Sequence, residues 1–151
     1  MPVLYTEGLV GEFSHTIDNK NRLSIPSKFR SVLGDHFVIS KGVERCLIIY
    51  TLEEWDAFQS RLAELNNFDQ DARAIKRFFG SGSAYVDIDP HGRILIPAPL
   101  KEYAGLTRDV TIVGDTGGRG EIWDSDAWNA AASEEDASVL TKNLMAKGFK
   151  G

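Results

Sequence analysis

Short apolar runs separated by turn residues dominate the first third of the chain. Residues 9–13, 23–25, 37–40 and 46–50 are rich in Val, Ile, Leu and aromatic side chains, and Gly, Asn and Asp bound them. Runs of this length and composition are typical of β-strands, whereas helices need longer periodic segments. We therefore expect four short strands in this part of the chain.

Helix signals lie between and after these runs. Residues 27–33 have Pro26 before them and Gly34 after them, a pattern that predicts a short helix. Thr51 and Glu54 form a capping box, in which the hydroxyl and the carboxylate each satisfy a free backbone amide at the start of a helix. The apolar residues that follow at helical spacing are Trp55, Phe58, Leu62 and Leu65.

The same pattern occurs twice along the chain. Residues 18–26 match residues 89–97 at an offset of 71 (89 − 18), and the offset becomes 73 after a two-residue insertion that follows Gly105. The twin of the first short helix is therefore expected over residues 98–104. Copies of about 70 residues are marginal on their own, because small chains bury too little apolar surface. We expect the two copies to interleave around one core with approximate two-fold symmetry.

The remaining segments are predicted to be a joining helix, a turn and a C-terminal tail. A helix over residues 69–79 joins the two copies, and the glycine-rich residues 80–83 end it. Residues 114–120 are also rich in glycine, but they lack the Lys-Ser/Thr ending of a phosphate loop and are expected to form a hairpin turn. The tail from Ser133 onward is weakly patterned, and residues 147–151 are expected to be frayed. The fold class expected is mainly β with short helices, an α+β protein.

Two tryptophans occupy equivalent positions in the two copies. Trp55 and Trp128 each follow a helix cap, at Thr51 and Asp124 respectively. A large aromatic ring at the same place in both copies indicates a packing role. We expect both tryptophans to anchor the core.

Composition excludes several classes of protein. The single cysteine, Cys46, excludes an intramolecular disulfide, and its apolar neighbours favour a buried, inert thiol. The three histidines show no metal-ligand spacing, so neither a metal nor another cofactor is expected. The first residues lack the features of a signal peptide, and no apolar stretch approaches the ~20 residues that span a bilayer. We expect a cytoplasmic protein with no membrane partner.

The distribution of charge matters more than its sum. The chain has 17 basic and 22 acidic residues, and a net charge of −5 argues at first sight against nucleic acid as a partner. However, residues 15–30 carry four basic side chains and one acidic side chain, whereas the matching residues 86–101 carry two of each. If a polyanion binds, the first copy is therefore expected to bind it, and the second copy to serve mainly in packing and assembly.

An Asp-x-x-x-Arg pair occurs once in each copy, as Asp18 with Arg22 and as Asp89 with Arg93. Turn-forming residues separate the two members, which predicts a tight hairpin with one member on each arm. One interpretation is a salt bridge that only holds the hairpin together. The other is that the Asp orients the Arg, which presents its guanidinium to a phosphate or a base edge. The spacing alone is compatible with both.

Other candidate groups give weaker signals. Arg73, Lys76 and Arg77 lie on one side of the predicted joining helix, as a solvated face or as a contact to DNA or to another subunit. His15 has Ser14 beside it, but no third member of a catalytic triad is evident and no serine lies in a nucleophile elbow. We expect no enzyme activity and no small-molecule substrate.

Five blocks of the chain carry a family resemblance. They are residues 15–26 with Phe29 and Arg30, residues 46–50 with Glu54 and Trp55, residues 77–84, residues 89–97 with 100 and 103–106, and residues 122–124 with Trp128. In this order and spacing, over roughly residues 8–130, the blocks resemble the MraZ family of bacterial transcriptional regulators. Asn21 departs from the pattern, because the family usually has Gly there. Asn tolerates positive φ better than other non-glycine residues, so the turn can survive.

The resemblance implies a fold and an assembly. The fold would consist of two tandem SpoVT/AbrB-type repeats, each a swapped-hairpin β-barrel, paired as a pseudo-dimer within one chain. The first domain would cover residues 8–66 and the second residues 84–131, with a helical connector at 67–83 and a tail at 132–151. Family members form ring-shaped homo-oligomers that bind repeated elements in the promoter of the division and cell wall gene cluster. They repress this promoter, and with it their own gene, which implies double-stranded DNA as partner and a nucleoid-associated location in the cytoplasm.

The resemblance also implies where DNA binds. It points to the first hairpin, with Arg22 as the main contact and Lys20 beside it, and the local charge adds Lys28 and Arg30. A carboxylate is repelled by DNA, so Asp18 is assigned an orienting role. Asp89 and Arg93 are assigned a structural role or a secondary contact, and Arg93→Ala is expected to weaken binding less than Arg22→Ala.

An alternative function comes from the same type of hairpin. AbrB-type hairpins also occur in antitoxins, in which a peptide tail captures a toxin. Under this interpretation the chain is a protein-interaction module, and residues 133–151 capture its partner. The weak patterning of this tail does not favour the alternative.

Overall fold

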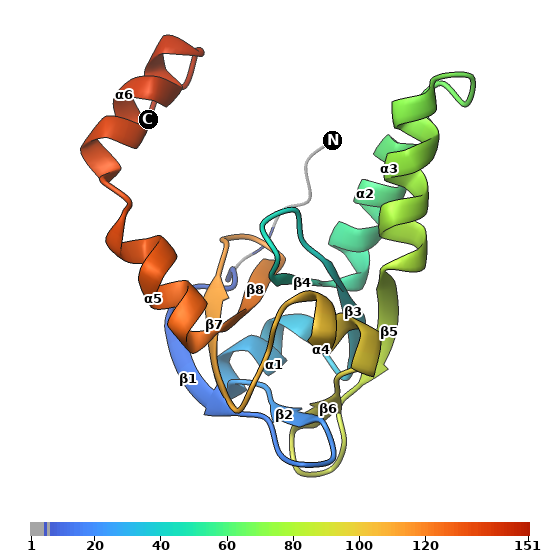
Figure 1. Cartoon of the computed structure of the whole chain (residues 1–151), viewed down its shortest axis with the longest axis vertical. Helices are drawn as coiled ribbons and strands as arrows, with labels where there is room; N and C mark the ends of the chain where they lie inside the picture. The colour runs from blue at the N-terminus through green and yellow to red at the C-terminus, as the bar shows by residue number, and fades with distance from the viewer. Residues whose placement is uncertain (1–4, 6) are drawn as a thin grey trace.

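The computed structural model describes residue 5 and residues 7–151 (Figure 1). The expectation that a signal peptide is missing falls mainly on residues 1–4 and 6, which lie outside the described residues. The strands are β1 (Glu12–Thr16), β2 (Arg22–Ser24), β3 (His36–Lys41), β4 (Leu47–Tyr50), β5 (Ser83–Asp87), β6 (Arg93–Leu95), β7 (Asp109–Gly114) and β8 (Arg119–Asp124). The helices are α1 (Ser27–Leu33), α2 (Leu52–Ala63), α3 (Gln70–Ser81), α4 (Ala98–Tyr103), α5 (Ser125–Ser133) and α6 (Ala137–Ala146). A β-sheet core with several short helices is thus confirmed.

The strands pair so that each copy completes the sheet of the other. The six-stranded sheet has the order β1-β7-β8-β4-β3-β5, and β2 pairs separately with β6. Strands β1 and β5 are equivalent in the repeat, and β1 runs antiparallel to β7 whereas β5 runs antiparallel to β3. The β2–β6 pair is another junction between the copies. These pairings confirm that the two copies interleave.

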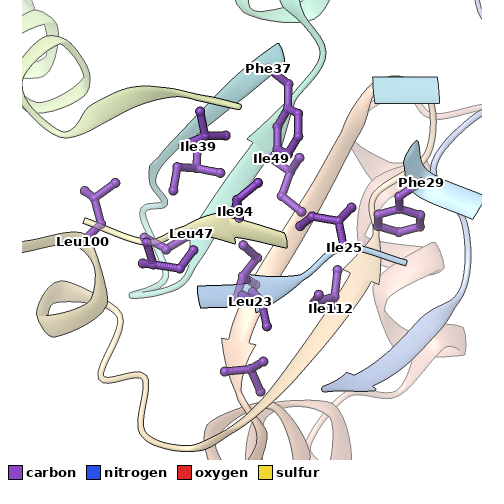
Figure 2. Packing of buried hydrophobic residues seen from close by; sticks show 14 of the residues in the cluster. Leu23, Ile25, Phe29, Phe37, Ile39, Leu47, Ile49, Ile94, Leu100 and Ile112 are labelled. Carbon is purple, nitrogen blue, oxygen red and sulfur yellow. The ribbon is translucent and has the colours of Figure 1, made fainter. Parts of the chain in front are cut away.

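Side chains of the central strands alternate between the two faces of the sheet, as successive residues of a strand must. On one face, Ile39, Ile49 and Ile112 belong to the same buried cluster as Leu23 and Ile94 of the β2–β6 pair (Figure 2). This cluster draws residues from both copies. Neither copy therefore has a hydrophobic core of its own.

A smaller aromatic cluster fills the opposite face of the sheet. Trp55 of α2 is buried, and its ring centroid lies 5.4 Å from that of Tyr50. Trp128 of α5 is only partly buried, with its ring centroid 5.7 Å from that of Trp123. The expected core role is confirmed for Trp55, whereas Trp128 packs against the cluster from its edge.

The first strand begins later than the apolar run at residues 9–13 predicts. Gly11 has a φ of +107°, which interrupts the extended backbone before Glu12. Leu9 is nevertheless buried, because its N–H donates to Gly117 O at 2.7 Å and its carbonyl accepts from Thr116 N at 3.1 Å. Leu9 therefore docks on the turn between β7 and β8, which is the hairpin turn expected over residues 114–120.

One predicted helix boundary and one predicted helix cap differ from the structure. Helix α3 continues through Gly80 to Ser81, and the N–H of Gly82 still donates to Phe78 O at 3.0 Å. At the start of α2, only half of the capping box forms, with Thr51 Oγ1 accepting from Glu54 N at 3.1 Å. The N–H of Thr51 donates to Gly118 O instead, so it is not available to the Glu54 carboxylate.

The C-terminal tail contains helix α6, which the weak pattern of residues 133–151 did not predict, and this helix ends before residues 147–151. Asp136 caps α6 by accepting from Ser138 N at 2.9 Å. At the other end, Gly148 has a φ of +104°, and the N–H of Phe149 donates to Leu144 O at 3.0 Å. A glycine at positive φ with these backbone bonds is a Schellman motif, a regular way to end a helix.

The elements divide the molecule into two ends. Figure 1 shows the turns that flank β2 and β6 at the bottom, with α2 and α3 projecting at the upper right and α5 and α6 at the upper left. Over the residues described, no helix is long and apolar enough to cross a membrane. The β2–β6 end carries both Asp-x-x-x-Arg pairs and is therefore the place to look for a site.

Candidate nucleic-acid interface

The first Asp-x-x-x-Arg pair closes a tight turn at the start of β2. Asp18 Oδ1 accepts hydrogen bonds from the backbone N–H groups of Lys20 and Arg22, each at 2.9 Å. Asp18 Oδ2 accepts from Arg22 Nε at 2.7 Å. One carboxylate thus holds both the turn and the guanidinium, and within the described residues the Nη groups of Arg22 make no hydrogen bond.

The second pair repeats this geometry. Asp89 Oδ1 accepts from His91 N at 2.8 Å and from Arg93 N at 2.9 Å, and Asp89 Oδ2 accepts from Arg93 Nε at 3.1 Å. The two interpretations of the motif are therefore compatible. The salt bridge exists in each copy, and it fixes each arginine through Nε alone, which leaves both Nη groups for another acceptor.

Both carboxylates are stabilised in the charged form. Hydrogen bonds to Asp18, first from the backbone and then from the side chain of Arg22, hold its pKa below the ordinary value of 3.8. The backbone N–H of Arg93 is the main cause of the same downward shift in the pKa of Asp89. Each hairpin therefore keeps its anion, and with it the fixed position of its arginine, at neutral pH.

The two hairpins form one surface. In the β2–β6 pair, Arg22 lies opposite Leu95 and Ser24 lies opposite Arg93. The residues between them, Leu23 and Ile94, point into the core (Figure 2), so these four share the outer face of the ribbon. Leu95 is 61% exposed there. The sequence assigned the second copy mainly to packing, but the structure places Arg93 on the same outer face as Arg22, with Arg93 Nη1 4.0 Å from Asp18 Oδ2.

Asn21 is accommodated in the first turn. Its φ is +61°, in the left-handed region that Asn tolerates. Its side-chain oxygen accepts a hydrogen bond from Lys101 Nζ at 2.9 Å. The residue thus keeps the turn and holds a cation from α4 of the other copy beside the first hairpin.

Gly92 occupies the equivalent place in the second turn, with a φ of +78°. A Cβ atom at Gly92 would lie 2.5 Å from Arg30 Nη1. The guanidinium of Arg30 therefore lies directly against the backbone of this turn. Arg30 and Lys101 are equivalent in the repeat, so each copy contributes one cation to the hairpin of the other.

The predicted basic residues are not all brought together. Arg30 lies at the second hairpin rather than the first, and Lys20 lies in the exposed first turn. Lys28 is two positions from Arg30 on α1, about 200° around the helix, and it lines a hollow with Gly8 and Val10 instead. Lys28 is therefore the predicted contact that the fold places away from the two hairpins.

Two residues at this surface were missed by sequence reasoning. Lys101 was counted as part of a neutral window, although the offset of 71 that pairs it with Arg30 was a signal for it. The same offset pairs Leu95 with the polar Ser24, and Leu95 alternates with Ile94 and Ile96, so its outward position also had a signal. The register with Arg22 places Leu95 on the outer face.

Comparison with known proteins decides the family. The model of the MraZ family, described as an antitoxin-like protein, matches residues 9–78 and again residues 79–149. The chain belongs to the MraZ family. The transcriptional regulator MraZ of Acetivibrio thermocellus is 47% identical over 129 residues, which are 85% of this chain and 90% of that protein. The transcriptional regulators MraZ of Limosilactobacillus fermentum and Clostridium botulinum are 44% and 42% identical over 94% and 93% of this chain, and over 96% and 99% of their own lengths.

The second basic group of this MraZ family member lies far from the hairpins. Arg73, Lys76 and Arg77 are on α3, at the opposite end of the molecule from β2 and β6 (Figure 1). Lys76 Nζ donates to Leu65 O at 3.1 Å, and Arg73 Nη1 donates to Asn67 O at 3.0 Å. These two cations therefore hold the loop between α2 and α3.

The reactive side chains do not form a chemical centre in the described part of the chain. Burial raises the pKa of the Cys46 thiol to about 12, which makes it a poor nucleophile, in agreement with the prediction of an inert thiol. Burial also lowers the pKa of His15, and no hydrogen bond joins it to Ser14 or Asp18 among the residues described. Within the same residues, no group of three or more His, Cys, Asp or Glu side chains has a geometry suited to a metal ion. The relatives are named transcriptional regulators, a class whose members are generally not enzymes.

Proposed function

We propose that the chain is a sequence-specific DNA-binding repressor that acts on repeated elements in the promoter of the division and cell wall gene cluster, including its own promoter. The observation that carries this proposal is the pair of arginines on one outer face, each fixed at Nε by its own aspartate. Family membership and the names of the relatives support the regulatory role. The protein would act in the cytoplasm at the nucleoid, without a cofactor or a small-molecule substrate.

The β2–β6 ribbon is the element that would read the DNA. The major groove of B-DNA admits a two-stranded β-ribbon, and arginine recognises guanine through O6 and N7 with two parallel hydrogen bonds. Arg22 and Arg93 can use their Nη groups in this way because Asp18 and Asp89 occupy Nε. One such contact contributes about 1–3 kcal/mol of discrimination against the wrong base.

The neighbouring cations would bind phosphates. Lys20, Arg30 and Lys101 flank the two turns, and Lys101 retains two ammonium hydrogens after its bond to Asn21. Phosphate contacts set the register of a protein on DNA, and they make binding sensitive to salt. Lys28 is a weaker candidate because of its position on α1.

The proposal includes the finer fold and the assembly that the family resemblance implies. The exchanged strands support two SpoVT/AbrB-type swapped-hairpin barrels, at residues 8–66 and 84–131, with a connector at 67–83 and a tail at 132–151. A ring-shaped homo-oligomer would bring several ribbons to repeated promoter elements. Linked sites bind more tightly than single ones because the later contacts form at high effective concentration.

A gel-shift titration tests the proposal. The duplex upstream of the chain's own gene is compared with a scrambled duplex, for the full chain and for Arg22→Ala and Arg93→Ala. Because the two hairpins are equivalent, each substitution is expected to weaken promoter binding by about 5- to 150-fold and to reduce sequence preference. This revises the smaller effect first expected for Arg93→Ala. Arg61→Ala, at the far end of α2, is the matched control and is expected to bind normally.

Salt dependence supplies a second readout. Lys20→Ala is expected to weaken binding to the promoter duplex and to the scrambled duplex by the same factor. It is also expected to reduce the slope of log K against log salt by about 0.9, the contribution of one phosphate. Binding that does not weaken as salt rises, or equal losses from Arg22→Ala and Arg61→Ala, would contradict the assignment of the ribbon to DNA.

A further inference from the structure

An apolar groove lies uncovered along α3 and the loop that joins α3 to α2. The groove has a volume of about 750 Å³, and Leu65, Ile75 and Phe78 supply much of its apolar lining. Phe68, in the loop between the two helices, is 94% exposed. Exposed apolar patches of this kind on a folded protein mark contact surfaces. The acidic side chains of Asp69 and Asp71 also line the groove.

Helix α6 is a second apolar element without a covering surface. It has ten residues and no buried side chain, and Val139, Leu140, Leu144 and Met145 are each 46–58% exposed. A helix shorter than about 12 residues is only marginally stable alone in water. The cap at Asp136 and the Schellman motif at Gly148 define both its ends. A well-delimited helix with this composition is therefore suited to packing against another surface.

The charges of the two surfaces are complementary. Residues 137–151 carry Lys142, Lys147 and Lys150 and no acidic side chain, whereas the groove presents Asp69 and Asp71. In turn, the segment just before α6 is acidic, with Glu134, Glu135 and Asp136 in succession, and α3 carries Arg73, Lys76 and Arg77. Complementary charges of this kind select the partner and fix its orientation.

The positions of the two elements favour a contact between copies. Figure 1 shows α2 and α3 on one flank of the sheet and α5 and α6 on the opposite flank, all projecting from the same end. A contact between two different surfaces of identical chains is heterologous, and its repetition closes into a ring when the rotation permits. The ribbon with Arg22 and Arg93 lies at the other end of each copy and stays free.

We propose that α6 of one copy docks in the groove along α3 of the next copy and that this contact builds the oligomer. This inference rests on the homo-oligomer of the proposed function, and it names α6 and the groove as the two surfaces through which the copies bind each other. It gives the tail the role of a subunit contact, in place of the capture of a foreign protein.

Light scattering during gel filtration of the full chain tests the contact. Leu144→Asp on α6 and Ile75→Glu in the groove are each expected to reduce the mass of the particle to the 16.7 kDa of one chain. Because the contact is heterologous, each variant keeps one intact surface, and an equimolar mixture of the two is expected to form a two-chain particle of twice that mass. Val43→Asp, at an 80% exposed residue of the β3–β4 loop, is the matched control and is expected to keep the assembly.

The outcomes separate this inference from the proposed function. An oligomer that persists in both variants overturns the docking and leaves the ring and its DNA binding standing. Variants that become single chains but do not pair when mixed overturn the heterologous contact. A single-chain particle for the unmodified protein overturns both the ring and the docking, whereas the gel shift with Arg22→Ala still tests DNA binding by itself. Circular dichroism checks that each variant is folded. Ile75 and Leu144 are both exposed, so neither substitution is expected to disrupt the fold.

Discussion

The junction between the two copies can be tested by truncating the pair of side chains beneath the ribbon. Leu23 and Ile94 lie directly opposite each other in the β2–β6 pair, and their exposures are 0% and 1%. They come from different copies and are 71 positions apart in the sequence. Leu23→Ala and Ile94→Ala therefore probe whether the copies share one core.

The expected magnitude follows from burial. Truncation of a fully buried Leu or Ile to Ala removes the transfer free energy of three methyl or methylene groups and leaves a cavity, at a cost of about 2–5 kcal/mol. The total free energy of unfolding of a domain of this size is about 5–15 kcal/mol. Each substitution is thus expected to lower the melting temperature by about 4–20 °C. Urea unfolding at one fixed protein concentration measures the change in free energy.

The double variant decides between one core and two. Side chains in contact share a cavity, so the two losses should deviate from additivity by about 0.5–3 kcal/mol. Leu95→Ala, next to Ile94 but 61% exposed, is the control and should change stability by no more than about 0.5 kcal/mol. Additive losses from Leu23→Ala and Ile94→Ala, or two separate unfolding transitions, would refute a shared core.

Two further predictions concern ionisable groups. The lowered pKa values of Asp18 and Asp89 mean that their contribution to stability is present above the ordinary pKa of 3.8 and is lost as pH falls through the folded values. The Asp18→Asn/Asp89→Asn variant should therefore lose less stability between pH 5 and pH 2, and an unchanged pH profile would contradict this. Because the pKa of Cys46 is about 12, the native thiol should resist alkylation at pH 8 and react once urea unfolds the chain. Rapid alkylation of the native protein would show that the thiol is accessible.

The parts of the fold that follow from local pattern could be predicted from the sequence. Pro26 and Gly34 delimit α1 as expected, and the repeat correctly placed α4. Features set by distant partners could not be predicted. Thr51 N–H, for example, binds Gly118 O, so the Glu54 half of the capping box does not form. Helix α6 was missed because its apolar residues surround the helix, so they form no single stripe.

In the candidate site, too, the local features could be predicted from the sequence and those set by distant partners could not. The spacing of Asp18 and Arg22 predicted a hairpin, and the geometry of that hairpin is local. The position of Arg93 beside Arg22 depends on the register of two strands from different copies, which no local pattern encodes. A count of charge in each copy does not contain this register, so it treats the two hairpins as if they were separate surfaces.

The exchange of β1 and β5 between the copies holds the two halves of the chain together. Each half of the chain holds a strand that pairs with the other half, so either half on its own would have unpaired strand edges. A single proteolytic cut in the loop at residues 64–69 would leave two fragments that remain bound to each other.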